Sequence, residues 1–161
     1  MKTEIKTHGG RLPAELRAST LVLLKRLGFN AKQHSFDEYE KAGLTPYHHA
    51  ILAVLDEGVP ETQAAIADSL GYDRGTLVGL LDELEERGLL ERQRDPNDRR
   101  RHLVQLTADG KRKLRRLRTL ARELEDEFLE PLSNAEREKL HALLLKLAAK
   151  HEPTCAPLPS G

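Results

Sequence analysis

Apolar residues recur every three or four positions along most of this chain, a spacing that places them on one face of a helix. In the first such segment Leu16, Leu23 and Leu27 share a face, while Leu21 and Val22 add a second apolar side. A helix that is apolar on two sides needs more than one neighbour. The pattern predicts helices over residues 12–33, 46–57, 63–70, 74–87 and 108–129, with a last one after Ser133.

Residues that favour helix ends stand between these segments. Thr62 precedes the helix over 63–70 and Asp73 precedes the next one, and both types of side chain accept hydrogen bonds from a first helical turn. Only Gly71 and Tyr72 lie between the end of the first helix and Asp73, the cap of the second. Because so short a connection forces the helices to cross steeply, it predicts a helix-turn-helix.

The spacing changes from helical to alternating after Gly88. Residues 90–94 and 102–106 predict two strands, and residues 95–98, Asp-Pro-Asn-Asp, favour a turn between them. Residues 99–101 are three consecutive arginines. The order of elements predicts a mainly α fold, a winged helix-turn-helix of about six helices with a two-stranded, basic wing.

Charge is sorted along the chain, although the formal net charge is zero. Residues 87–118 hold 12 Lys and Arg against 4 Asp and Glu, a net charge of +8. Residues 56–86 hold 1 against 9, a net charge of −8. A concentrated basic segment is the electrostatic footprint of a nucleic-acid-binding protein. The basic run within residues 111–118 could touch flanking phosphates or could be the solvated face of a helix.

Several classes of protein fit the composition poorly. Cys155 is the single cysteine, so no intrachain disulfide can form and a cytoplasmic location is expected. The longest apolar run, residues 50–55, is far shorter than the ~20 residues of a membrane span. The chain has neither a glycine-rich phosphate loop nor a nucleophile-elbow motif. We therefore expect no enzyme activity and no cofactor.

The wing segment contains Asp98, Arg100, Leu106 and Thr107 in the order Asp-x-Arg, five residues, Leu-Thr. This pattern resembles the wing signature of the MarR family of bacterial regulators (multiple antibiotic resistance regulators). Gly71 and much of the segment from Leu80 to Leu89 also resemble that family's recognition-helix region. The resemblance extends over residues 12–150 and is densest between 62 and 110. It implies a transcriptional regulator that binds double-stranded DNA as a homodimer, held together by its first helix and its last two.

The resemblance implies that the start of the second helix of the helix-turn-helix and the wing contact DNA. Small residues in those first turns let the backbone approach the bases. Because Val78 and Gly79 stand where many family members carry a polar or basic residue, specificity is expected to depend more on Arg74, Thr76 and the wing. The resemblance further implies that Arg100 or a neighbouring arginine inserts into the minor groove of DNA, and that a salt bridge to Asp98 orients that arginine. The expected DNA-binding residues are Arg74, Gly75, Thr76, Val78, Gly79, Arg94, Asp98, Arg99, Arg100 and Arg101.

The same resemblance implies a domain organisation. Within a single domain over 12–151, residues 45–107 form the DNA-binding lobe, and residues 12–33 and 108–151 form the dimerisation helices. Residues 1–11 are expected to be a flexible arm and residues 152–161 a disordered tail. A two-fold dimer presents two recognition helices about 34 Å apart, which suits a pseudo-palindromic operator. Members of the family usually repress a promoter until a ligand releases them.

Effectors of the family are often small aromatic acids or phenols, and Tyr47, His48 and His49 are the candidates to line such a pocket. The simpler alternative is that one histidine faces solvent and the other caps or packs. A metal-responsive regulator is a rival, but adjacent histidines point to different helix faces and have no Cys or acidic partner at ligand spacing, so no metal site is expected. A helical interaction module that does not bind DNA is a further alternative.

Overall fold

The computed structural model describes residues 10–57 and 61–155. The expected helix stop at 58–60 and most of the predicted arm and tail, residues 1–9 and 156–161, lie outside the described residues. The elements, in chain order, are α1 Ala14–Arg17, α2 Thr20–Lys41, α3 Pro46–Asp56, β1 Glu61–Thr62, α4 Gln63–Leu70, α5 Arg74–Glu86, β2 Leu90–Arg94, β3 His102–Leu106, α6 Ala108–Phe128, α7 Asn134–His151 and a short 3-10 turn η1 Pro153–Cys155.

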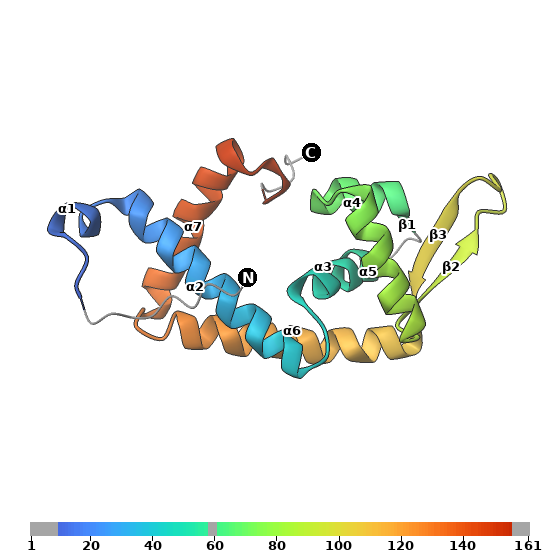
Figure 1. Cartoon of the computed structure of the whole chain (residues 1–161), viewed down its shortest axis with the longest axis horizontal. Coiled ribbons are helices and arrows are strands. Elements are labelled where there is room, and N and C mark those ends of the chain that lie inside the picture. Colours follow the sequence, from blue (N-terminus) through green and yellow to red (C-terminus); the bar gives the residue numbers. More distant parts are fainter. Residues whose placement is uncertain (1–9, 58–60, 156–161) are drawn as a thin grey trace.

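The long helix α6 connects two groups of elements (Figure 1). It starts at the base of the wing, passes beneath α3, and ends beside α2 and α7. The helix-turn-helix and the wing gather at one end of the molecule, and α1, α2 and α7 gather at the other. Among the helices described, none combines the length and the apolar character that crossing a membrane requires.

The N-terminal helical region differs from the prediction of one helix over 12–33. α1 ends at Arg17, and α2 begins after Ser19, whose hydroxyl accepts a hydrogen bond from the Val22 amide at 3.3 Å. α2 then continues to Lys41, because no proline interrupts it before Gly43 turns the chain with a φ of 75°. The split at Ser19 gives seven α-helices within the described residues, where about six were expected.

The remaining helix boundaries agree with the sequence pattern to within one residue. In each case the predicted cap side chain accepts a hydrogen bond from the backbone of the first turn, as observed at Thr45, Thr62, Asp73, Thr107 and Ser133. Residues 153–155 form a 3-10 turn, so this part of the expected disordered tail is ordered.

The wing is a hairpin with the predicted strands, and its pairing runs from Leu90 opposite Leu106 to Arg94 opposite His102. A third strand was not predicted. β1 pairs antiparallel with the outer side of β3, which gives the order β1-β3-β2. Because β1 is only two residues long and includes Thr62, which also caps α4, its sequence carries no alternating pattern to recognise.

The hydrophobic core lies between α3, α4, α5, α6 and the base of the wing. Ile51 of α3, Ile66 of α4, Val104 of β3 and Leu114 of α6 are fully buried there. α5 adds Leu77, Leu81 and Leu84 from one face. The core therefore fixes α5, the predicted recognition helix, and the wing to the same body.

Gly110 in the first turn of α6 is required for a close backbone approach. A Cβ at this position would overlap the carbonyl oxygen of Leu89. The Thr107 hydroxyl donates a hydrogen bond to the Gly88 carbonyl at 2.6 Å, and the Thr107 amide donates to the Leu89 carbonyl at 3.2 Å. These contacts join the end of the wing to the loop that follows α5.

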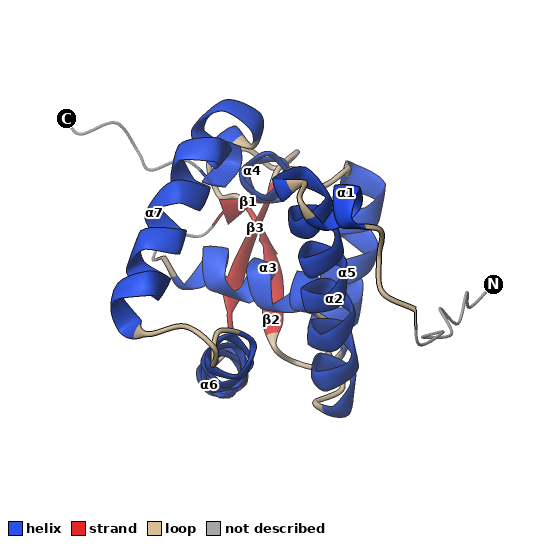
Figure 2. Ribbon diagram, turned by 90° about the vertical axis from the view of Figure 1, so that its left-hand side faces the viewer, coloured by secondary structure: helices blue, strands red, loops and turns tan. Residues whose placement is uncertain are grey.

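An apolar groove of about 810 Å³ lies between α2, α6 and α7. Leu24 and Leu27 of α2, Phe128 of α6 and Leu144 of α7 line it, and all four are exposed. Figure 2 shows α2 and α7 on either side of this region with α6 below. α7 buries no residue of its own in the described chain. A helix of 18 residues usually gains most of its stability from packing, so the exposure of α7 distinguishes this end of the described chain from the core.

Candidate nucleic-acid interface

The two helices of the helix-turn-helix, α4 and α5, meet at Gly71. That glycine has a φ of 67°, a left-handed conformation that residues with a Cβ rarely adopt. Because Leu77, Leu81 and Leu84 hold one side of α5 in the core, its first turns face outward. The predicted contact residues on this helix are all exposed, namely Arg74, Gly75, Thr76, Val78 and Gly79.

Thr76 is committed to the cap of its own helix. Its amide donates a hydrogen bond to Asp73 Oδ1 at 2.9 Å, and its hydroxyl donates to Asp73 Oδ2. These hydrogen bonds lower the pKa of the Asp73 carboxyl. The hydroxyl proton of Thr76 is therefore already used within the chain, so this hydroxyl does not donate to another group, and the methyl group remains available for an apolar contact.

An ion-pair cluster joins the wing to the recognition helix. The guanidinium of Arg92, on β2, donates to Glu85 Oε2 from Nε at 3.0 Å and also bonds to Asp82 through Nη2. Its backbone amide donates to Glu85 Oε1 at 3.2 Å, and Nη1 reaches Gln63 of α4 at 3.4 Å. The bond from Arg92 lowers the pKa of Glu85, and the same bond raises the pKa of Arg92.

His48 anchors the same helix from α3. Its Nδ1 accepts a hydrogen bond from the Thr45 amide at 3.1 Å, and its Nε2 donates to Glu83 of α5 at 2.9 Å. The ring is buried, and this desolvation lowers its pKa. Of the alternatives for the paired histidines, His48 takes the capping role.

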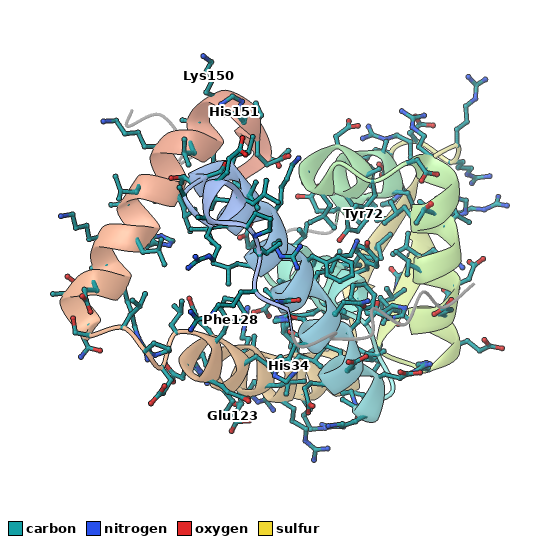
Figure 3. All side chains as sticks on the ribbon, turned by 60° about the vertical axis from the view of Figure 1, so that its left-hand side comes forward. His34, Tyr72, Glu123, Phe128, Lys150 and His151 are labelled. Carbon is teal, nitrogen blue, oxygen red and sulfur yellow. The ribbon has the colours of Figure 1, made fainter. Side chains whose placement is uncertain are left out.

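Tyr47 and His49 occupy different surroundings from each other. Tyr47 packs edge-on against Phe36 of α2, with ring centroids 5.3 Å apart, and against Tyr72 of the helix-turn-helix, at 5.5 Å. The Tyr39 hydroxyl donates to Nδ1 of His49 at 2.6 Å, and burial lowers the pKa of His49. Neither Tyr47 nor His49 lines the groove between α2, α6 and α7. Figure 3 places Tyr72 near α4 and α5, and His34 and Phe128 on the other side, near α6.

The tip of the wing is a compact loop with its arginines outward. The Asp95 amide donates to the Arg101 carbonyl at 2.9 Å, and Asp98 Oδ1 accepts from the backbone amide of Arg100 at 3.0 Å. Asp98 thus holds Arg100 through its backbone, and the expected salt bridge to its guanidinium is not formed. Among the ion pairs of the described residues none involves the tip arginines or Arg94, all of which are exposed.

Half of the basic side chains within residues 111–118 of α6 bind other groups of the same chain. Arg112 pairs with Asp109, Arg118 pairs with Asp56 at 2.9 Å, and Lys113 donates to the Ala42 carbonyl at 2.8 Å. These contacts favour a structural role for half of the run. In the described part of the chain no three His, Cys, Asp or Glu side chains are arranged to hold a metal ion.

Sequence reasoning did not find Arg92 or Glu83, which hold the recognition helix in place. Arg92 was indistinguishable from the other wing arginines in the sequence, although β-strand alternation puts it on the opposite face from Glu91 and Gln93. Glu83 was one of four acidic residues on α5, and only the three-dimensional position of α3 shows that it meets His48.

Comparison with known proteins agrees with this arrangement. A family model described as the MarR family matches residues 42–101, which contain the helix-turn-helix, the first wing strand β2 and the wing tip. The transcriptional regulator HosA of Escherichia coli O111:H- is 31% identical over 110 residues, which cover 68% of this chain and 82% of HosA. The chain belongs to the MarR family.

Solved structures extend the MarR-family likeness to most of the chain. The transcriptional repressor CouR, bound to a 23-mer DNA duplex, matches with a TM-score of 0.77 and 34% identity, over 86% of this chain and 99% of CouR. The PcaV transcriptional regulator of Streptomyces coelicolor, in complex with its natural ligand, matches with a TM-score of 0.70 and 28% identity, over 88% of this chain and 100% of PcaV. This MarR-family protein is a DNA-binding transcriptional regulator with a winged helix-turn-helix.

Replacing Arg92 with Ala should lower the free energy of unfolding by about 1 kcal/mol, because a partly exposed ion-pair cluster is lost. The melting temperature at pH 7 should fall by about 2–4 °C. Because Arg92 holds the pKa of Glu85 below its ordinary value of 4.5, the stability from this pair is present above that pH and is lost as the pH falls through the folded-state pKa.

The difference in melting temperature between the wild type and R92A should therefore shrink in acid. Arg94→Ala, an exposed arginine on the same strand, is the matched control and should change the melting temperature little. An R92A variant as stable as the wild type at pH 7 would show that the cluster does not hold the wing to α5.

Proposed function

We propose that this protein is a ligand-responsive repressor that binds a pseudo-palindromic operator as a homodimer. The observation that carries the proposal is the joint presentation of two surfaces by one rigid body. The outward first turns of α5 offer small side chains and Arg74, and the wing tip beside them offers exposed arginines without acidic partners among the described residues. The repressor CouR, a neighbour in fold, is bound to a DNA duplex.

In this proposal α5 enters the major groove and the wing reaches the flanking minor groove. Gly75 and Gly79 let the backbone of α5 come close to base edges, and Arg74 contacts a guanine or a phosphate. Arg100 is the arginine that enters the minor groove, because Asp98 fixes its backbone at the turn. Arg94, Arg99 and Arg101 contact phosphates on either side.

The homodimer is formed by the N- and C-terminal helices of two copies. Support comes from the apolar groove between α2, α6 and α7, because exposed leucines at one end of a soluble molecule mark an interaction surface. The organisation into a DNA-binding lobe over 45–107 and dimerisation helices over 12–33 and 108–151 forms part of the proposal. A two-fold axis through this end would place the two α5 helices on successive turns of one face of DNA, about 34 Å apart.

The effector is a small aromatic acid or phenol bound beside Tyr47. Tyr47 is 38% exposed, and its ring lies between Phe36 of α2 and Tyr72 of the helix-turn-helix. A flat ring that stacks there would touch the dimerisation helix and the DNA-binding lobe together. The structural neighbour PcaV is in complex with its natural ligand.

The proposal predicts salt-sensitive binding to a symmetric DNA site, which can be recovered by selection from random-sequence duplexes. Replacing Arg100 with Ala should weaken binding roughly tenfold or more. The slope of log affinity against log salt concentration should fall by about 2 per dimer, since each wing loses one charge at the DNA. Lys150→Ala, on α7 at the far side from the wing (Figure 3), is the charge-matched control and should leave the slope unchanged.

No binding of any duplex at low salt would overturn the regulator hypothesis in favour of an interaction module. Unchanged affinity and slope in R100A would remove Arg100 from the interface.

The dimer predicts a molar mass in sedimentation of twice the 18.1 kDa of one chain. Changing Leu27 and Leu144 together to Glu should give a monomer with the helical content retained, because both side chains line the groove and are exposed in a single copy. Val78→Glu, which also places an acid at an exposed apolar position but on α5, should remain a dimer. A monomeric wild type at micromolar concentration would contradict this part of the proposal.

An effector should raise the melting temperature and release the operator at the same concentrations, since it stabilises the state that it binds. A panel of small aromatic acids and phenols tested by thermal shift should yield such a compound. Tyr47→Leu should abolish both effects, while Tyr47→Phe, which keeps the ring, should retain them. If every compound that stabilises the protein leaves the operator bound, the effector proposal is wrong.

A further inference from the structure

Val78 is an exposed aliphatic side chain that the fold does not explain. It is 38% exposed at the fifth position of α5. The other large apolar residues exposed in the described chain lie on α1, α2, α6 and α7, where four of them line the apolar groove, apart from Tyr47, which packs between two aromatic rings. Val78 therefore belongs neither to the core nor to the surface proposed for the dimer.

Gly79 beside it is equally unexplained by the chain itself. Glycine is the least favourable residue in a helix interior apart from proline, and a β-branched valine is also less favourable there than alanine. The backbone of Gly79 is not left-handed, and a Cβ built on it would meet nothing within 4 Å. Neither a strained turn nor packing against a neighbour accounts for Gly79, and its position beside an exposed valine leaves an open, apolar patch on α5.

The surface around Val78 offers few hydrogen-bond donors. Helical spacing puts Gly75, Val78 and Gly79 on one face, and the two glycines contribute only backbone. The hydroxyl and the amide of Thr76 are both bonded to Asp73. Arg74, in the first turn, is the remaining side chain with donors in this part of the described helix. The centre of the face therefore has the chemistry of methyl groups on a helix that can be approached closely.

The major groove of DNA presents one apolar group to such a surface, the C5 methyl of thymine. Building on the proposed function, we propose that Val78 reads a thymine methyl in each half-site. Gly75 and Gly79 bring the helix backbone close enough for the contact. This assigns specificity in α5 to an apolar contact, where the sequence had suggested Arg74 and Thr76 as the specifying residues.

The position of Val78 is held firmly enough for such a contact. Leu77 and Leu81, on either side of it in the helix, are fully buried. His48 from α3 and Arg92 from the wing each bind an acidic side chain further along α5. Because van der Waals attraction falls off within a fraction of an ångström, a methyl-to-methyl contact needs this kind of support.

The test replaces each thymine of the selected operator in turn with deoxyuridine, which removes the methyl group and keeps every hydrogen bond of the base pair. At one symmetric pair of positions the wild type should lose about fourfold in affinity per half-site, the effect of one buried methyl group. The Val78→Ala variant should bind the thymine operator more weakly than the wild type. Its affinity should not fall further when deoxyuridine replaces thymine at that pair of positions. Glu86 is exposed on the same helix beyond the contact region. The Glu86→Ala variant should therefore lose as much affinity as the wild type when deoxyuridine replaces thymine.

Two variants separate recognition from folding. Val78→Ala should melt no lower than the wild type, because alanine is the better helix former at an exposed position. Gly79→Ala should melt higher and yet bind the operator more weakly, because its Cβ occupies the space of the close approach.

If the wild type binds its operator and no deoxyuridine position distinguishes it from V78A, the thymine inference is overturned while the proposed function stands. If the wild type binds no duplex, the proposed function itself fails.

Discussion

The burial of Leu77, Leu81 and Leu84 is the constraint on which the DNA-facing surface depends. Burying three leucine side chains contributes roughly 5–9 kcal/mol, which is comparable with the whole net stability of a typical domain. Turning α5 about its axis by one residue, about 100°, would expose these side chains. The core therefore determines that Gly75, Val78 and Gly79 face outward, whatever DNA the protein binds.

Charge is arranged around that constraint. α5 carries four acidic residues in its second half, where they would repel DNA if they were free. Arg92 pairs with Asp82 and Glu85, so two of the four have a cationic partner within the chain, and Glu83 accepts a hydrogen bond from His48. The wing supplies both the arginine that turns inward to this cluster and the exposed arginines at its tip. A protein with no net charge can in this way present a basic surface to DNA.

The helix boundaries could be predicted because caps are local. Thr45, Thr62, Asp73, Thr107 and Ser133 each act on a backbone amide within three residues, so the sequence alone contains the signal. The prediction of one helix over residues 12–33 was nevertheless wrong. Ser19 is also a cap, but the apolar stripe of Leu16, Leu23 and Leu27 passes through it and suggested one continuous helix.

Contacts between distant segments could not be predicted. His48 and Glu83 are 35 residues apart, and no periodicity relates them, so the sequence left His48 open between an effector pocket and a capping role. Arg92 points inward by strand alternation, but its acidic partners depend on how β2 docks against α5. The exposure of the tip arginines, in contrast, follows from their place in a turn, although a hydrogen bond from the Arg100 backbone amide to Asp98 replaces the salt bridge that was expected.

A structure of the protein on its selected operator tests the central claim most directly. The account predicts the first two turns of α5 in the major groove, with a Val78 methyl carbon within about 4 Å of a thymine methyl. It predicts the guanidinium of Arg100 in the adjacent minor groove of the same half-site. DNA lying along the basic face of α6, with the first turns of α5 directed to solvent, would contradict it.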